Sequence, residues 1–331
     1  MSLSKSPPVF VREDGSPPGS LPESIMALGA LAERIAAATQ VDLAAVLVRL
    51  RAECVSLGAN VRRDLAARKI SPHVWSQSLI EFYRDTDAFF YELVVWNRTR
   101  EKTRQREWIV RFIENHWQRP VSVLVYGDGL GFDGAVLQRA GHRVAGFEVS
   151  SKYGAFARKL FADLGVAVEW IDHEEGLRDR RFDVIVCLDV LEHVPDPPAL
   201  AKDLADHLLP EGCLLVHAPF WLVDDATQTH LLSNRTYSGD WRRLYAPAGL
   251  IPVAARWMWN PVALARQTER SRHFGWGGLF RVSLSRWFLV MARFVPLPFN
   301  IGARAMLRAD VHRGGASFPV AADGSRSGGA A

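Results

Sequence analysis

The stretch Val121-Ser-Val-Leu-Val-Tyr-Gly-Asp-Gly-Leu-Gly131, followed by Arg143-Val-Ala-Gly-Phe-Glu148, decides the fold of this 331-residue chain. The first apolar run predicts a strand, the glycines predict a turn into a helix, and the second apolar run ends on a carboxylate. Missing side chains let a ligand lie against the backbone amides at the start of a helix. A carboxylate at the tip of the neighbouring strand can accept hydrogen bonds from a ribose diol. The layout therefore predicts a nucleoside-binding α/β half-site.

The glycine spacing distinguishes between classes of nucleotide. Gly127, Gly129 and Gly131 form a G-x-G-x-G pattern, whereas a dinucleotide fingerprint needs its third glycine at position 132, which is Phe132. A tight βα turn without a ligand remains the alternative. The spacing argues against a nicotinamide-dependent oxidoreductase.

Composition sets the broad class of protein. Hydrophobic residues make up 48% and charged residues 23%, as in globular proteins, and the net charge is only +4. Basic residues are scattered among acids with no basic patch, so nucleic acid is not an expected partner. Cys54, Cys187 and Cys213 lack metal-ligand spacing and are expected to be buried apolar filler. No run reaches transmembrane length and no signal peptide is evident, which predicts a cytoplasmic protein.

Changes in composition and periodicity divide the chain into five parts. We expect a disordered N-terminus at 1–20, a helical extension or cap at 21–118, and a ligand-binding core at 119–258. A C-terminal extension at 259–311 could hold a last strand and a helix, and 312–331 should be a disordered tail. The oligomeric state is not predictable from these patterns.

The core alternates predicted strands and helices, which indicates a doubly wound, mostly parallel, seven-stranded Rossmann-like sheet. The expected strands are 121–126, 144–147, 166–171, 182–188, 212–218 and 250–257, and the expected helices are 133–140, 151–164, 198–208 and 237–246. Farther on, 261–272 reads as helix and 278–285 as a returning strand. The apolar runs 287–292 and 294–299 fit either a helix packed on the sheet or an amphipathic element that touches lipid.

The helical extension contains an aromatic segment after Ser71-Pro72, a pair that predicts the start of a helix. Its rings could pack a helical core or wall a substrate pocket. They are Trp75, Phe82, Tyr83, Phe89, Phe90 and Trp96.

The most specific motif of the chain is Leu188-Asp-Val-Leu-Glu-His-Val-Pro-Asp-Pro197. Together with the glycine turn, Gly146-Phe-Glu148 and Trp170-Ile-Asp172, it resembles class I methyltransferases that use S-adenosyl-L-methionine, and most of all the group of ubiquinone-biosynthesis O-methyltransferases. The resemblance covers about residues 120–256.

The resemblance implies a set of cofactor-binding residues. The glycine turn would pack against the methionine part of the cofactor, and Glu148 would bind the ribose hydroxyls. Asp172 would accept from the adenine amino group with His173 beside the ring, while Leu188 and Asp189 would lie near the sulfonium end. The chain departs from the family at Val125, where relatives carry an acid. Asp128 could replace that contact, or cofactor affinity could have fallen.

Catalysis by a methyltransferase needs little beyond holding a nucleophile in line with the methyl group, aided by a base if the acceptor is a hydroxyl. His193 and His230 are the candidate bases, since histidine titrates near neutral pH. His193 could instead brace the turn before Pro195, and His217 is expected to be structural. No metal site is expected, because metal-ligand spacings are absent.

The resemblance implies a methyltransferase acting on a small-molecule or glycan-like acceptor, with a hydroxyl as the expected target. The alternative is a non-catalytic S-adenosylmethionine-binding scaffold whose N-terminal helices bind a partner. Val125 and the arginine- and tryptophan-rich C-terminal region motivate this alternative. The apolar runs 287–292 and 294–299 leave peripheral membrane contact open.

Overall fold

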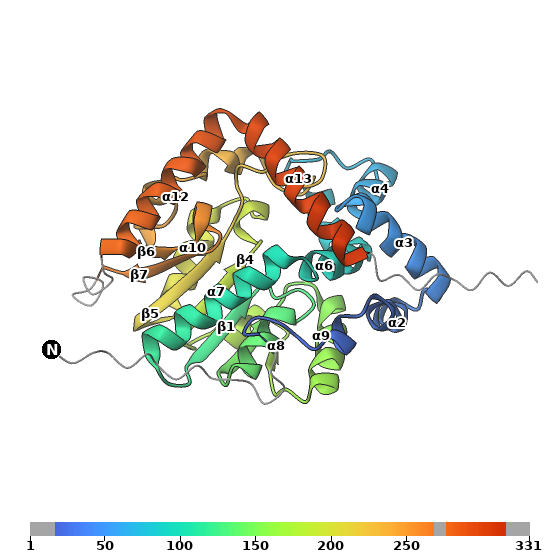
Figure 1. Cartoon of the computed structure of the whole chain (residues 1–331), viewed down its shortest axis with the longest axis horizontal. Coiled ribbons are helices and arrows are strands. Elements are labelled where there is room, and N and C mark those ends of the chain that lie inside the picture. The colour runs from blue at the N-terminus through green and yellow to red at the C-terminus, as the bar shows by residue number, and fades with distance from the viewer. Residues whose placement is uncertain (1–16, 268–275, 316–331) are drawn as a thin grey trace, which may run out of the picture.

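The computed structural model describes residues 17–267 and 276–315, which surround one seven-stranded sheet (Figure 1). The strand order is β3-β2-β1-β4-β5-β7-β6, and β7 runs antiparallel to both of its neighbours while the other pairs are parallel. The strands are β1 Ser122–Tyr126, β2 Arg143–Phe147, β3 Glu169–Ile171, β4 Phe182–Leu188, β5 Leu208–His217, β6 Leu250–Ala255 and β7 Val262–Arg266. The predicted doubly wound, mostly parallel seven-stranded fold is confirmed.

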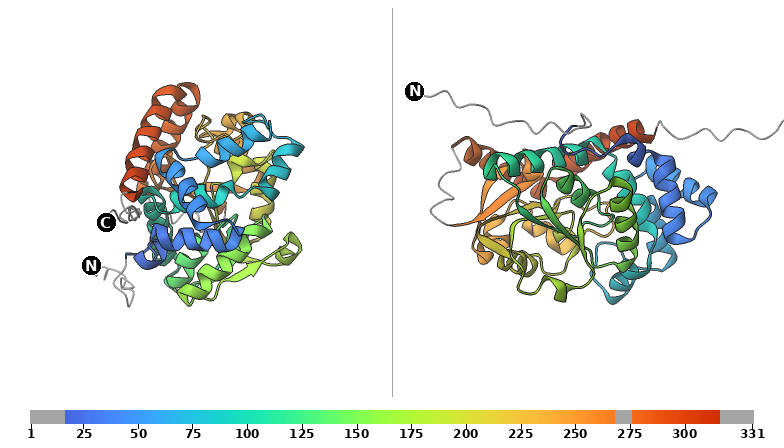
Figure 2. Two further views of the ribbon diagram at one scale, coloured as in Figure 1. Left: turned by 90° about the vertical axis from the view of Figure 1, so that its right-hand side faces the viewer. Right: turned by 90° about the horizontal axis from the view of Figure 1, so that it is seen from below.

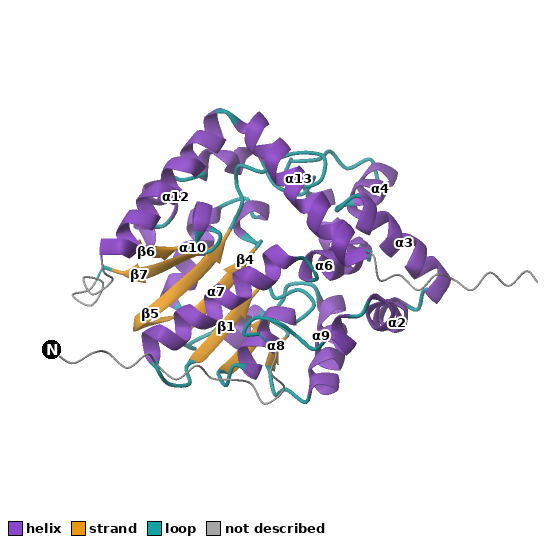
Figure 3. Ribbon diagram, in the orientation of Figure 1, coloured by secondary structure: helices purple, strands orange, loops and turns teal. Residues whose placement is uncertain are grey.

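The central strands are apolar on both sides because helices cover both faces of the sheet (Figure 3). Val123, Val184 and Val186 pack toward one core, whereas Leu124 and Ile185 pack toward the other, as the two-residue period of a strand requires. The first core includes side chains of α7 Arg100–Trp117, α8 Phe132–Arg139 and α9 Ser151–Leu164, and the second those of α10 Pro197–Asp206 and α12 Trp276–Phe294.

Adjacent parallel strands bring distant residues to one edge of the sheet. β1 pairs with β2 on one side and β4 on the other, with Val123 in register with both Val144 and Val184. The carboxyl ends of these three strands therefore meet, and this is where ligands bind in open α/β sheets. The segments that follow Tyr126, Phe147 and Leu188 form the candidate site.

The predicted helical extension consists of seven helices, as the periodicity of 21–118 indicates. They are α1 Glu23–Met26, α2 Leu28–Thr39, α3 Leu43–Val55, α4 Ala59–Ala67, α5 Gln77–Asp85, α6 Ala88–Asn97 and α7. Their buried residues, from Leu21 to Ile113, join the sheet in a single hydrophobic core. The division of the chain at residue 118 stays a prediction, since the two parts share this core.

Local signals placed one helix start wrongly. The structure begins α5 at Gln77, where the Ser76 hydroxyl accepts a 3.1 Å hydrogen bond from the amide of Leu79. Ser71-Pro72 lies in a turn instead. This turn is held by the loop after β5, because the His73 amide donates to Gln228 O at 2.8 Å and Leu232 N donates to His73 O at 3.0 Å.

The C-terminal prediction was wrong in two places. Residues predicted as a helix from 261 contain β7, which is held between β5 and β6 by antiparallel pairing. The predicted returning strand at 278–285 lies inside α12, which packs against β6 and the short helix η5 Trp257–Trp259. The predicted helix at 237–246 is reduced to α11 Trp241–Leu244, flanked by short 3-10 turns.

A last helix, α13 Pro296–Gly315, returns across α3 and α6. The helices α12 and α13 form an inverted V in the view of Figure 1, and from below they lie along one edge of the molecule (Figure 2, right). Residues 312–315, predicted as the start of a disordered tail, belong instead to α13. The predicted disorder of 1–16 and 316–331 lies outside the described residues. Within the described ranges, no helix is long and apolar enough to cross a bilayer.

Candidate active site

The glycine turn between β1 and α8 holds left-handed backbone at all three glycines, with φ of 73° at Gly127, 59° at Gly129 and 84° at Gly131. Only glycine adopts such angles without strain. Gly131 is also required by packing, because a Cβ there would lie 2.7 Å from Phe161 and 2.8 Å from Ala157 on α9. The three glycines are therefore required by the backbone conformation of the turn, and Gly131 is required by packing against α9 as well.

Glu148 follows β2 and reaches back to the glycine turn. Its Oε2 accepts a 3.0 Å hydrogen bond from Gly129 N, and its Oε1 accepts one of 3.0 Å from Ser150 N. Burial raises the pKa of Glu148, and these two amides oppose the rise. Each oxygen keeps a further lone pair, so the carboxylate can still accept hydrogen bonds from a diol.

Both oxygens of the Asp128 carboxylate accept hydrogen bonds from backbone amides of α8. Its Oδ1 accepts from Asp133 N at 3.0 Å and its Oδ2 from Gly134 N at 2.9 Å, so it caps the first turn of α8 from within the core. Burial, with the nearby charge of Asp133, raises the pKa of Asp128 well above its usual range. The carboxylate supports the shape of the turn and is directed into α8.

Asp172 and His173 follow β3 and are both exposed. Asp172 forms a bidentate pair with Arg158 of α9, with Oδ1 and Oδ2 at 2.5 and 2.6 Å from Nη2. Neither residue is buried against the glycine turn. An adenine contact for them stays a prediction.

Leu188 is buried as the last residue of β4, and Asp189 follows it in left-handed backbone with φ of 60°. The Asp189 carboxylate accepts hydrogen bonds from Trp96 Nε1 at 3.0 Å, Lys102 Nζ at 3.1 Å and His217 Nδ1 at 2.6 Å. Burial alone would raise the pKa of Asp189, but the charges of Lys102 and His217 hold it well below its usual range. His217 thus holds this carboxylate in place, and its structural role stays a prediction.

Lys102 links the helical extension to two parts of the site. It is buried, and its Nζ lies 3.2 Å from Asp133 of α8 and 3.1 Å from Asp189. Arg106, one turn farther along α7, donates to Asp133 at 2.6 Å. Burial lowers the pKa of Lys102, but the two carboxylates outweigh it and raise the pKa overall. The lysine is therefore a fixed cation beneath the ends of β1 and β4.

Glu192, His193 and His230 come together beyond β4, and we call them the Glu-His-His trio. The Nε2 atoms of both histidines lie 3.9 Å from Glu192 Oε1, and the two rings are 4.7 Å apart and perpendicular. His193 Nδ1 lies 3.1 Å from Thr229 O, and His230 Nδ1 lies 2.7 Å from Leu222 O. A carbonyl can only accept, so each Nδ1 carries the proton and each Nε2 presents a lone pair to the glutamate.

The protonation states of the trio follow from its burial. Burial lowers the pKa of His193 to about 4 and that of His230 well below its usual range, so both rings are neutral at pH 7. Burial and the charge of Asp189 raise the pKa of Glu192 well above its usual range. Neither oxygen of Glu192 has a hydrogen-bond partner within the described part of the chain. Unpaired buried polar atoms of this kind are uncommon outside functional sites.

The trio is also the group of described residues that could hold a metal ion, because its potential ligand atoms lie within 4.8 Å of one another. Two imidazoles whose Nδ1 atoms donate to carbonyls, with one carboxylate, are a usual ligand set for a divalent transition metal. The sequence showed no metal-ligand spacing, since His230 lies far along the chain from Glu192 and His193. The three cysteines are free and buried, as expected.

The helical extension supplies a wall of this site. The Tyr83 hydroxyl lies 2.9 Å from His193 Nδ1, and the ring of Tyr83 stacks on Phe89 with centroids 5.2 Å apart. Trp96 contacts Asp189, as described above, whereas Phe82 and Phe90 are fully buried core residues. The core-packing interpretation is therefore confirmed for Phe82 and Phe90, whereas a substrate-pocket role for Tyr83 and Trp96 stays a prediction.

The sequence analysis did not single out four residues of the site: Tyr83, Trp96, Lys102 and Glu192. Tyr83 and Trp96 belong to the aromatic segment, but nothing in the sequence distinguishes them from the aromatic residues of that segment that pack in the core. Glu192 stood within the most specific motif, next to His193. Lys102 is one of only six lysines in a chain rich in arginine, which was the one available hint.

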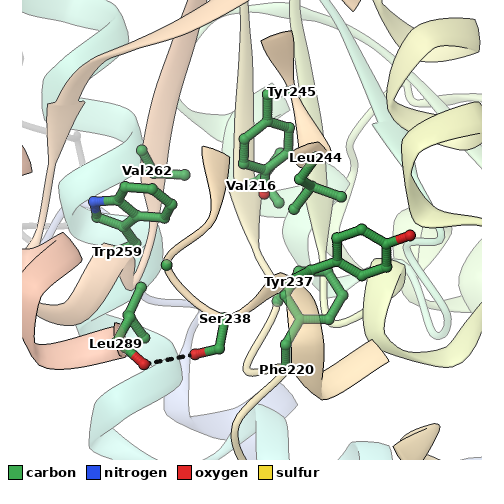
Figure 4. A pocket seen from close by; sticks show the side chains of 11 residues that line it. Val216, Phe220, Tyr237, Ser238, Leu244, Tyr245, Trp259, Val262 and Leu289 are labelled. Carbon is green, nitrogen blue, oxygen red and sulfur yellow. Dashed lines mark hydrogen bonds between the residues drawn. The ribbon is translucent and has the colours of Figure 1, made fainter. Parts of the chain in front are cut away.

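A small cavity lies beyond the carboxyl end of β5 and is separate from these residues (Figure 4). Its walls include Val216, Tyr237, Tyr245 and Trp259, and the Ser238 hydroxyl beside it donates to Leu289 O at 2.9 Å. None of the predicted site residues lines it. It is a gap in the packing between the sheet and α12.

Comparison with known proteins identifies the core. A family model described as a methyltransferase domain matches residues 96–271, more than half of the chain. Ubiquinone biosynthesis O-methyltransferase of Actinobacillus pleuropneumoniae serotype 5b is 30% identical over 100 residues, covering 28% of this chain and 43% of that protein. The same enzyme of Idiomarina loihiensis is 32% identical over 135 residues, covering 37% and 54%.

The chain thus spans about half the length of the curated relatives it matches. Among solved structures, the ribosomal protein L11 methylase of Lactobacillus delbrueckii subsp. bulgaricus is 16% identical, with a TM-score of 0.37 over 50% of this chain and 80% of that one. The family match covers α7, the whole sheet and the site residues from Trp96 to His230. The chain belongs to the family of S-adenosylmethionine-dependent methyltransferases.

Proposed function

We propose that this protein transfers a methyl group from S-adenosylmethionine to a hydroxyl of a small-molecule or glycan-like acceptor. One contact carries the proposal: the side chain of Val190 lies directly against Gly127. This contact brings segment 189–193, with Asp189 and two members of the Glu-His-His trio, beside the glycine turn. A cofactor held on the turn would therefore meet an acceptor held by the trio.

The residues around the glycine turn fit the cofactor. Gly129 offers a backbone without a side chain, and the adjacent Glu148 is a half-buried carboxylate with lone pairs free for two ribose hydroxyls. Leu188 and Asp189 would border the methionine end. Asp172 and His173 would reach adenine only if Asp172 leaves or shares its pair with Arg158.

When bound, the cofactor supplies an activated methyl group on a sulfonium. The protein then has to hold the acceptor oxygen in line with the carbon–sulfur bond and remove the hydroxyl proton. As the carbon–oxygen bond forms and the carbon–sulfur bond breaks, the proton would pass to the lone pair of His193 Nε2 or His230 Nε2. Both rings are neutral at pH 7 and can accept it.

The trio admits a second way to lower the pKa of the acceptor hydroxyl. A divalent cation held by Glu192, His193 and His230 would coordinate the oxygen and favour its ionised form. The two mechanisms differ in a measurable way. Loss of turnover on chelation, restored by Zn²⁺, Mn²⁺ or Mg²⁺, supports the cation, whereas activity that survives chelation supports direct proton transfer.

A non-catalytic scaffold is the second candidate function, and a specific observation favours it. Val125 is buried in β1 where the family carries an acid, and the Asp128 carboxylate that could replace this acid is directed into α8. The amino group of a bound cofactor would then lack that contact. This protein would bind the cofactor without turnover, using its helical extension to hold a partner.

One experiment separates the two functions. The purified chain is titrated with S-adenosylmethionine by calorimetry and then incubated with methyl-labelled cofactor and a host metabolite extract, followed by mass spectrometry. Binding with a labelled product supports the methyltransferase. Binding without product and with a stoichiometric partner supports the scaffold, and absence of binding excludes both.

A further inference from the structure

Helix α12 has two apolar faces, although packing accounts for only one of them. Val282, Ser285, Leu289 and Ala292 are buried toward the sheet. On the opposite side, Phe280, Leu284, Trp287 and Phe294 are exposed by 69%, 38%, 56% and 70%. Steps of four, three and seven residues place these four side chains on one stripe of the helix.

The stripe continues beyond α12. Phe294 is followed by further exposed apolar side chains on the turn and on α13, and Trp257 of η5, 53% exposed, lies 4.4 Å from the ring of Phe288. We call this surface the outer apolar stripe: Trp257, Phe280, Leu284, Trp287, Phe294, Val295, Leu297 and Ile301. Contiguous apolar surface of this kind marks an interaction site rather than ordinary exposure.

The segment that carries most of the stripe has an excess of positive charge. Residues 276–315 contain six arginines and a single acid, Asp310, an excess of five positive charges in a chain whose net charge is +4. The carboxylate of Asp310 already accepts a hydrogen bond, because its Oδ2 lies 3.0 Å from the amide nitrogen of Glu101. Arg281 and Arg308 are exposed, and neither forms an ion pair with another described residue. Positive charge therefore borders the apolar stripe.

We propose that the outer apolar stripe docks this protein on an anionic membrane surface. Aromatic and aliphatic side chains flanked by arginines are the composition of helices that lie in the plane of a charged bilayer interface. A second copy of the chain fits less well, because a two-fold contact through this face would bring its arginines together. No described helix spans a bilayer, so the contact is peripheral.

The docking surface is tied to the Glu-His-His trio. Arg304 of α13 pairs with Asp224 at 2.7 Å, and Arg235 donates to the carbonyl of Arg293 at 3.0 Å. These bonds join α12 and α13 to the loop between β5 and α11 that carries His230. A membrane contact on the stripe would hold that loop beside the lipid surface.

Vesicle sedimentation tests the proposal. The full chain is spun with vesicles of phosphatidylcholine alone and of phosphatidylcholine with phosphatidylglycerol, at low and high salt. We expect binding to the anionic vesicles that falls about fivefold for each arginine neutralised by Arg281→Gln or Arg308→Gln. The variant F280S/W287S/F294S should bind at least about tenfold more weakly.

The controls keep the outcome decisive. V48S/V55S/V74S removes three exposed valines elsewhere, with exposures of 64%, 66% and 54%, and should bind as the wild type does. All substituted side chains are exposed, so circular dichroism and melting temperature should be unchanged. Absence of binding to anionic vesicles overturns the proposal, as does equal binding by F280S/W287S/F294S. A dimer in sedimentation velocity that this variant abolishes, without vesicle binding, would assign the stripe to self-association instead.

Discussion

The two halves of the site are built in different ways. The glycine turn and Glu148 lie within one β-turn-helix-β unit, 21 residues from Gly127 to Glu148. The Glu-His-His trio and its surroundings come from α5, from the segment after β4 and from the loop after β5. The first half repeats a local pattern that many nucleoside-binding chains share, whereas the second half exists only once the helical extension has folded onto the sheet.

Lys102 connects the two halves, and it should show the largest effect on stability. Lys102→Met removes the buried cation between Asp133 and the partly buried Asp189. Because Arg106 and His217 still pair with these two carboxylates, we expect a cost of about 3 kcal/mol in free energy of unfolding. Lys202→Met is the matched control, because Lys202 pairs with Asp206 on the surface and should cost less than about 0.5 kcal/mol. Urea denaturation measures both, and equal costs would contradict a structural role for the buried pair.

The trio should dominate turnover but not cofactor binding. His193→Ala and His230→Ala are each expected to lower kcat about 10²- to 10³-fold, the usual contribution of a positioned acid or base. The cofactor Kd should change little. Measurement requires the acceptor identified from the metabolite extract, and His116→Ala, at an exposed position near the end of α7, serves as the control. A variant that loses both binding and turnover would show that the two halves are not separable.

Glu148 tests the cofactor half alone. Glu148→Ala removes the carboxylate that faces the proposed ribose hydroxyls, and we expect cofactor affinity to fall about 100-fold. Asp172→Ala should lower the cofactor affinity less than about tenfold, because Asp172 is exposed and already paired with Arg158. Calorimetry compares the two. A larger loss at Asp172 would mean that the adenine contact outweighs the ribose contact.

The smallest expected effect concerns pH, at a residue outside both halves. Burial lowers the pKa of His142 to about 4, and neither ring nitrogen has a hydrogen-bond partner among the described residues. Since the unfolded ring titrates near 6.5, the neutral form favours folding above that pH, and stability is lost as pH falls toward 4. Between pH 7 and pH 5, His142 should cost the wild type about 2 kcal/mol in free energy of unfolding. The His142→Phe variant should not show this loss. An unchanged pH dependence would contradict this origin.

The elements of the core could be predicted because each strand and helix carries its own pattern. Ser151–Leu164 and Phe182–Leu188 were predicted to the residue, one from a serine cap and a glycine stop, the other from an unbroken β-branched and apolar run. β7 was missed because Val262-Ala-Leu-Ala-Arg266 has no strand-like alternation and contains good helix formers. Its conformation comes from pairing with β5 and β6.

The hydrogen-bond partners of Asp128, within the site, could not be predicted from the sequence either. The sequence places a carboxylate between two glycines of a ligand-binding turn, which favours a ligand contact. The structure gives it the free amides at the start of α8, because a buried carboxylate takes the nearest unpaired donors. Position along the chain could not decide between these two sets of donors.

By itself, the sequence determined the family and the strands from β1 to β6, and it predicted the cofactor half of the site. These depend on residues close in the chain and on the two- and 3.6-residue periods of strands and helices. The tertiary structure decided which aromatic rings reach the site, that Lys102 lies between two carboxylates, and that Glu192, His193 and His230 share one point. It also decided that α12 keeps a second apolar face in solvent. Side chains far apart in sequence meet only through packing, and packing depends on the whole chain at once.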